Sequence, residues 1–251
     1  MNESLGAMCD DVYVNSRLFV KLPLPTNRET LLGFFDRLRK AFPSLTKLRR
    51  GDDGALTLEE DRPEGGSRRW IRLEETSLRF GYFAPPKVSD ARELGNVILE
   101  HAPYHLSFSE LDYDHMEVVY GFDLEFRGNH DLLVAETLMS NHPLAAFMFG
   151  DDACHVLDMQ PFMGIALTPS CDIQAYIDIK SRTSSYEVRT GEYEAHPLSV
   201  YLTIRKYWGF SESENLADAH NRLLDHADEL AEDRVVPLLV NPLAHAIASR
   251  S

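Results

Sequence analysis

The chain has 251 residues, of which 44% are hydrophobic and 26% charged, and this ordinary globular composition excludes a largely disordered protein. Its 25 Lys and Arg stand against 40 Asp and Glu, so the formal net charge is −15. Such an excess repels phosphate backbones, and we therefore expect no nucleic-acid partner. The longest apolar runs are far shorter than the roughly 20 residues that a bilayer helix needs, so we expect no membrane partner either.

The negative charge is concentrated in the second part of the chain. Residues 1–116 contain 16 basic and 19 acidic side chains, and residues 117–251 contain 9 and 21. This asymmetry suits a basic partner, although solubility alone would also explain it. The acidic first residues do not form a signal peptide, and Cys9, Cys154 and Cys171 form no CxxC pair. We therefore expect a cytoplasmic protein.

The first part of the chain alternates strand and helix patterns. Apolar side chains recur at every second position in residues 17–24, which is typical of a half-buried strand. Asn27 or Thr26 can cap the helix that follows, and Pro103 is expected to end a second helix. The expected elements are a strand at 17–24, a helix at 27–42, strands at 45–49, 55–59, 69–74 and 77–83, and a helix from 89 to about 101.

The same order of patterns follows in the second part. Alternation is strictest over residues 173–179 and 198–204, which predicts two central strands. Pro143 is expected to divide a long helix. The expected elements are a strand at 118–126, a helix at 130–149, strands at 155–159, 164–168, 172–180 and 198–207, and a helix at 214–230.

This order predicts an α+β protein made by tandem duplication of a β-α-β-β-β-β-α unit. Each unit has one sheet face to cover and two helices to cover it, so we expect a curved antiparallel sheet with helices on one face. The other face would stay open. The expected divisions are an N-terminal tail at 1–12, a first unit at 13–103, a connector at 104–115, a second unit at 116–232 and a C-terminal tail at 233–251.

The element order resembles the duplicated fold of the TATA-box binding protein family. That family grips DNA with a concave basic sheet and apolar wedges. DNA binding is not expected here, because the chain is acidic and the side chains expected on the open face are chemically mixed. They are Phe19, Lys21, Trp70, Arg72, Asp123, Glu125, Tyr176, Asp178, Tyr201, Thr203 and Arg205.

The densest group of potential metal ligands lies between the two units. His101 and His105 are four residues apart, and Asp112, Asp114 and His115 follow. Two histidines at this spacing on one helix would share a face and could bind a metal. However, Pro103 lies between them and is expected to end the helix, so a polar connector is the favoured interpretation.

No cofactor or catalytic motif is apparent elsewhere. Cys154 adjoins His155, but consecutive residues of a strand point to opposite faces, and the acidic neighbours would raise the pKa of the thiol. A buried structural cysteine is the simpler interpretation. The glycines form neither a GxGxxG nor a Walker loop, so the sequence predicts no cofactor, no metal and no assigned catalytic residue.

Two segments are candidates for association. Residues 181–197 separate two confident strands, where hairpin loops usually have 2–5 residues, so this segment is either an interaction loop or an irregular extension of the hairpin. The apolar tail at 235–247 either docks on its own core or forms a homodimer, and Pro237 and Pro242 are expected to break it into short pieces.

These observations favour a non-enzymatic interaction module, such as an adaptor, chaperone or assembly component. It would bind a protein or peptide of basic character through the open face and the 181–197 loop. The alternatives are a small-molecule-binding regulator and an enzyme with a dispersed His/Asp site. The candidate contact residues are Trp70, Tyr176, Tyr186, Arg189, Tyr193, Tyr201 and Arg205.

Overall fold

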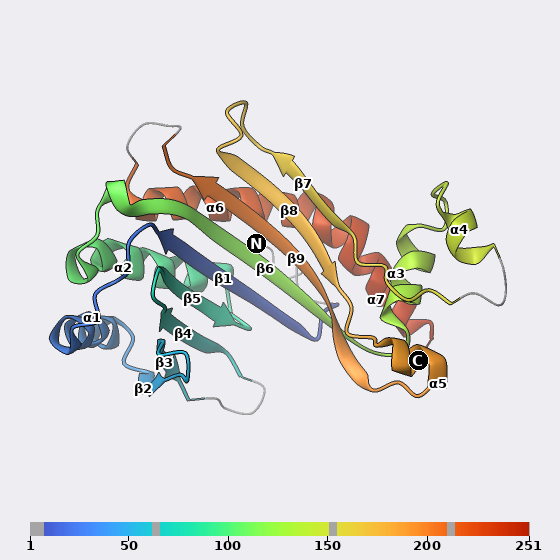
Figure 1. Ribbon diagram of the computed structural model, residues 1–251, viewed down its shortest axis with the longest axis horizontal. Helices are drawn as coiled ribbons and strands as arrows, with labels where there is room; N and C mark the ends of the chain where they lie inside the picture. The colour runs from blue at the N-terminus through green and yellow to red at the C-terminus, as the bar shows by residue number, and fades with distance from the viewer. Residues whose placement is uncertain (1–7, 62–65, 151–154, 210–213, 251) are drawn as a thin grey trace.

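The computed structural model describes residues 8–61, 66–150, 155–209 and 214–250. These residues form one open antiparallel sheet with helices on one side (Figure 1). The strands are β1 (Asp11–Val20), β2 (Leu45–Arg50), β3 (Leu56–Glu60), β4 (Arg68–Leu73), β5 (Ser77–Phe83), β6 (Tyr113–Arg127), β7 (Phe162–Ala166), β8 (Ile173–Lys180) and β9 (Ala195–Tyr207). The helices are α1 (Arg28–Ala41), α2 (Val88–Leu106), η1 (Glu110–Asp112), α3 (His130–Leu138), α4 (Ala145–Phe149), α5 (Ser185–Thr190), α6 (Leu216–Leu230), η2 (Ala231–Val240) and α7 (Asn241–Ala248).

Two long strands form the centre of the sheet. The strand order is β2-β3-β4-β5-β1-β6-β9-β8-β7, and β1 pairs antiparallel with β6. We call the elements from β1 to α2 the first half and those from β6 onward the second half. Each half adds its strands outward from the central pair, so both contribute to one continuous sheet.

Helix α6 attaches to the centre of the sheet through two polar contacts and meets α2 there. The Tyr120 hydroxyl on β6 donates to Asp228 on α6 at 2.7 Å, and Ser16 Oγ on β1 lies 2.8 Å from His220 Nε2 on α6. The His220 ring lies directly against Gly95 of α2, where an added Cβ would come within 2.2 Å of it. The absence of a side chain at Gly95 therefore allows α2 and α6 to meet over the sheet.

The expected α+β class and the open antiparallel sheet are confirmed, and the elements of the first half occur in the expected order. Two of these elements have other bounds than expected. The first strand starts at Asp11 and ends at Val20, and Leu22, expected inside it, is 63% exposed. Helix α2 continues through Pro103 to Leu106, because Ala102 and Leu106 are buried in the core and a proline in the last turn removes only one backbone donor.

The second half departs from an exact repeat. The segment at 155–159 is not a strand, because its backbone bonds to side chains near the start of α3. Asn129 Nδ2 donates to the Val156 carbonyl at 2.9 Å, and the Met159 N–H donates to Asp131 at 2.8 Å. The described part of this half thus has three strands after α3, whereas four follow α1. The division of the helix near Pro143 is confirmed.

The C-terminal tail is a continuous helical segment, so the expectation that Pro237 and Pro242 break it was wrong. Pro242 lies in the first turn of α7, where no N–H needs an intrahelical acceptor, and Pro237 lies within η2, which is wound as a π-helix. Val235, Val240 and Leu243 are buried against the rest of the chain. The tail therefore docks on its own core. Among the described helices, none has the length and apolar character required to cross a bilayer.

Candidate functional site

The side of the sheet that faces away from α2 and α6 is the candidate site, and we call it the open face (Figure 1). Strand alternation defines it, because Val14, Ser16 and Leu18 of β1 are buried on the helical side and their neighbours project the other way. Its side chains include Tyr13, Asn15, Arg17 and Phe19 on β1, Arg68, Trp70 and Arg72 on β4, Arg79 and Phe83 on β5, His115, Glu117 and Asp123 on β6, Tyr176 and Asp178 on β8, and Tyr201, Thr203, Arg205 and Tyr207 on β9.

A row of arginines crosses the open face. The strand register aligns Arg72 on β4 with Arg79 on β5, and Arg79 with Arg17 on β1. Arg17 is aligned with Glu117 on β6, and Glu117 with Arg205 on β9. Directly opposed residues of neighbouring strands have Cβ atoms about 5 Å apart, so these five side chains form one continuous band of charge.

Glu74 stabilises the part of this band that lies on the first half. It accepts hydrogen bonds from Arg17 Nη2 at 2.7 Å, Arg72 Nε at 3.1 Å and Arg79 Nη1 at 3.2 Å. Burial alone would raise the pKa of Glu74, but bonds from Ser77 and Arg79 and the charge of Arg17 outweigh it and lower the pKa below its usual value. Three guanidinium groups therefore share one ionised carboxylate.

Aromatic rings lie flat on the open face because glycines make room for them. A Cβ added at Gly81 would come within 2.8 Å of Trp70 Nε1, and one at Gly121 within 2.2 Å of the Tyr13 ring. Each ring thus lies across the strand beside it. Burial raises the pKa of Tyr13, and hydrogen bonding with Tyr201 and the nearby charge of Asp123 raise it further, so this phenol stays neutral.

Arginines and aromatic rings also contact one another. The guanidinium of Arg17 lies 4.0 Å from the centre of the Phe19 ring, and that of Arg205 lies 5.1 Å from the Tyr176 ring. Both distances are within the range of a cation–π interaction. A shallow depression of about 250 Å³ lies nearby on β3, β4 and β5, lined by Thr57, Glu59, Arg68, Trp70, Arg72 and Arg79.

Four of the predicted contact residues project onto the open face. Tyr176 and Arg205 are in contact, and Tyr201 lies beside Tyr13 with ring centroids 6.3 Å apart. Trp70 is on β4, and β5, β1 and β6 lie between it and β9. The four therefore belong to one surface but form two separate groups on it.

The other three predicted contact residues lie at the end of the sheet, on and beside α5 (Figure 1). Arg189 stacks over Tyr186 at 5.4 Å, and the Tyr193 carbonyl accepts a bond from Arg127 Nε at 2.9 Å. Ser184 and Glu187 form a capping box that orders the start of this helix. The segment at 181–197 thus contains a short helix and is not a plain hairpin loop.

The predicted histidine group is divided between the two sides of the sheet. His101 and His105 do share a face of α2, with ring centroids 6.3 Å apart, because the helix passes through Pro103. Arg37 Nε donates to His101 at 3.0 Å, and burial, His101 and Arg37 together lower the pKa of His105. His115 is on β6 and stacks on Phe19 of the open face.

The other candidate ligands and nucleophiles are placed as follows in the described part of the chain. The described residues contain no group of three or more His, Cys, Asp or Glu side chains arranged to hold a metal ion. Cys154, considered with His155 as a nucleophile, lies outside the described residues. Cys171 is exposed in the turn before β8.

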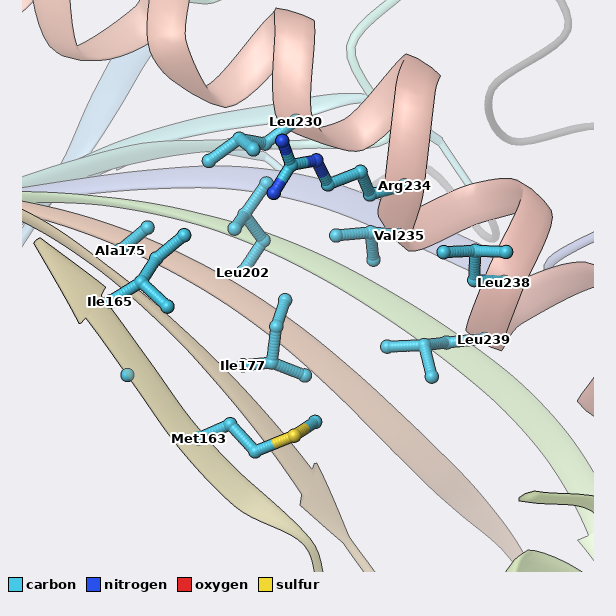
Figure 2. A pocket seen from close by; sticks show the side chains of 11 residues that line it. Met163, Ile165, Ala175, Ile177, Leu202, Leu230, Arg234, Val235, Leu238 and Leu239 are labelled. Atoms are coloured by element: carbon cyan, nitrogen blue, oxygen red, sulfur yellow. The ribbon is translucent and has the colours of Figure 1, made fainter. Parts of the chain in front are cut away.

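The helical side of the sheet contains an apolar groove of about 300 Å³ beside β7 (Figure 2). Met163 and Ile165 of β7 and Ile177 of β8 form one wall, and Val235 and Leu239 of η2 face them. The lining is almost wholly apolar, and Arg234 is its one charged side chain, so the groove offers mainly shape and apolar surface.

Sequence reasoning missed several residues of the open face, notably Tyr13, Arg17, Glu74 and Arg79. Tyr13 was missed because the first strand was expected to start at residue 17, whereas it starts at Asp11. Alternation with the buried Val14 and Leu18 would have placed Tyr13 and Arg17 on the outward side. The alignment of Arg17 with Arg79 depends on the pairing of β1 with β5, which no local pattern specifies.

Comparison of the sequence with protein-family models gives no match, and comparison with curated proteins gives none either.

Proposed function

We propose that the chain is a non-enzymatic protein-interaction module, an adaptor, chaperone or assembly component, that binds a protein or peptide segment on its open face. The observation that carries this proposal is the band of arginines with flat aromatic rings beside it, from Arg72 to Arg205. Arginine and aromatic residues are enriched in contact surfaces, since they combine apolar area with directional donors. The segment around α5 supplies a second, separate contact.

The charges on the open face suggest where different parts of a partner bind. On the first half, Arg17, Arg72 and Arg79 outnumber the two carboxylates that pair with them, Glu74 and Asp53, so acidic side chains of the partner bind there. On the second half, Asp123 and Asp178 favour basic groups. This arrangement suits an extended segment that carries both signs of charge, with its acidic end over β4 and β5.

The proposal is tested by charge reversal on the open face. Arg79→Glu should abolish recovery of the partners that wild-type protein retains from cells, because it places a carboxylate in the centre of the arginine band. Arg39→Glu is the matched control, since it makes the same change of charge at an exposed position of α1 on the helical side. Equal loss of partners with both variants, or no loss with either, would contradict the open face as the contact surface.

The contribution of the α5 segment is tested separately. A protein lacking residues 183–195 should lose a subset of these partners and keep those that depend on Arg79. An unchanged partner set would exclude the segment as a contact element.

We also propose that the two halves derive from duplication of one unit. The order of strands outward from β1 and from β6 supports this, as does the equivalent place of α2 and α6 at the end of each half. The test is a superposition of β1, β5, β4 and α2 on β6, β9, β8 and α6. If α2 and α6 take different positions when the strands are superposed, the proposal is contradicted.

A further inference from the structure

The two edges of the sheet differ in how well they are protected against pairing with another strand. Edge strands expose unpaired backbone groups, and charged side chains are a common protection. β2 forms one edge and carries Lys47, Arg49 and Arg50, all exposed. β7 forms the other edge, and the whole stretch 159–171 around it contains no charged residue.

The side chains of β7 are apolar and unusually exposed. Phe162 is 64% exposed, Met163 52% and Ile165 50%. Met163 and Ile165 line the apolar groove, and Leu238 across the groove is 62% exposed (Figure 2). The unprotected edge and the apolar groove are therefore one continuous surface, which the rest of the chain covers only in part.

Three residues of β7 have their backbone N–H and C=O groups directed away from β8. The Leu167 N–H bonds to Ile173 of β8 at 2.8 Å, and Ile179 of β8 bonds to the Pro161 carbonyl at 3.1 Å. Hydrogen bonds to one neighbour recur at every second residue, so the N–H and C=O groups of Phe162, Gly164 and Ala166 face away from β8. These three residues present the free edge.

The sequence of β7 is self-complementary about Gly164. In an antiparallel pair centred on this residue, Gly164 meets its own copy, Phe162 meets Ala166, and Met163 meets Ile165. A large side chain is thus placed beside a small one on the open face, and two aliphatic side chains meet on the helical side. Gly164 has to lack a side chain, because a Cβ there would come within 2.7 Å of the Tyr176 ring.

We propose that β7 pairs with β7 of a second copy of this chain, across a two-fold axis at Gly164. The pairing joins two sheets edge to edge and extends the apolar groove with Met163 and Ile165 of the partner. It uses no residue of the arginine band, so it is independent of the function proposed for the open face. A second copy is favoured over a foreign peptide because the edge is uncharged and matches itself residue by residue.

The size of the protein in solution tests this proposal. Light scattering at tens of micromolar should give a mass of twice 28.5 kDa for the wild type. Ile165→Lys should halve the mass, because it introduces two charges facing Met163 at the paired edge. Leu48→Lys, at a partly exposed position of the β2 edge, should leave the mass unchanged.

A second variant and a second measurement keep the test valid if Ile165→Lys fails to fold. Ala166→Pro removes an outward N–H and leaves the bonds to β8 intact, and it should also halve the mass. In the wild type, the amides of Phe162, Gly164 and Ala166 should exchange slowly with solvent and speed up on dilution. A monomeric wild type, a dimer unaffected by Ile165→Lys and Ala166→Pro, or a dimer lost in Leu48→Lys would each overturn the proposal.

Discussion

The two halves of the sheet begin alike and end differently, and the difference starts at the first linker of each half. β1 ends at Val20, and residues 21–27 let the chain turn back before α1. β6 is longer and runs to Arg127, and only Gly128 and Asn129 separate it from α3. Helix α3 starts directly beyond this short linker, lies at the end of the strand and packs against α7.

This difference determines how well the outer strands are covered. In the first half, Leu58 on β3 and Ile71 on β4 are fully buried, and Phe34 and Leu38 of α1 belong to the same core. In the second half, the groove-facing Ile165 of β7 remains half exposed. The first half therefore has a closed core, and the second half, whose first helix follows its first strand after only two residues, has an open groove.

The largest expected effect comes from a matched pair of isoleucines. Ile71→Ala should lower the free energy of unfolding by about 2–5 kcal/mol, since it removes a fully buried side chain and leaves a cavity. Ile165→Ala should lower it by about 1 kcal/mol or less, because this side chain is already half hydrated. Urea unfolding of dilute protein, under conditions where association does not contribute, measures both. Equal losses would show that the β7 side is as well covered as the β4 side.

Local patterns in the sequence predicted most of the strands and caps. Alternation located the second-half strands β8 and β9, and Asn27 was recognisable as a helix start. The patterns failed where tertiary contacts determine the local structure. Residues 155–159 have strand character, yet Asn129 and Asp131 bond to their backbone instead, and α2 passes Pro103 because burial of its last turn outweighs one lost donor.

The candidate site was predictable only in part. Alternation alone placed Trp70, Tyr176, Tyr201 and Arg205 on the uncovered side of their strands. The arginine band was not predictable, because it arises from the register of five strands that are distant in sequence. Glu74 was equally hidden, since it lies just beyond β4 and reaches three arginines only after β1, β4 and β5 have paired.

A smaller effect, on the pH dependence of stability, is expected at the contact between the two halves, where His220 of α6 lies between β1 and α2. Complete burial and, to a smaller extent, the charge of Arg92 together lower the pKa of His220 to about 3. Ser16 bonds to Nε2, and Nδ1 has no hydrogen-bond partner among the described residues. The folded protein therefore keeps this imidazole neutral.

The sign of the pH dependence follows from this depressed pKa. Below about pH 6.5 the unfolded chain takes up a proton at His220 that the folded chain does not, so stability is lost as the pH falls from there towards 3. This residue should contribute a loss of about 2 kcal/mol between pH 7 and pH 5. His220→Gln should reduce the measured pH dependence by that amount in urea titrations at the two pH values. An unchanged dependence in His220→Gln would mean that the site becomes hydrated and protonated in the folded state.

The smallest expected effect on stability compares one carboxylate on each half of the open face. Glu74 forms ion pairs with three arginines of the first half, of which Arg72 also pairs with Asp53, whereas Glu117 is paired with Arg205 of the second half. Glu74→Gln should lower the free energy of unfolding by about 1 kcal/mol at low salt, because Arg17, Arg72 and Arg79 then repel one another, and Glu117→Gln should lower it by about 0.3 kcal/mol. Both losses should shrink in 1 M NaCl, where screening acts within about 3 Å, and the larger loss should shrink more. Equal costs that do not respond to salt would indicate that the two carboxylates act through packing, and that the arginine band is no more strongly charged on the first half than on the second.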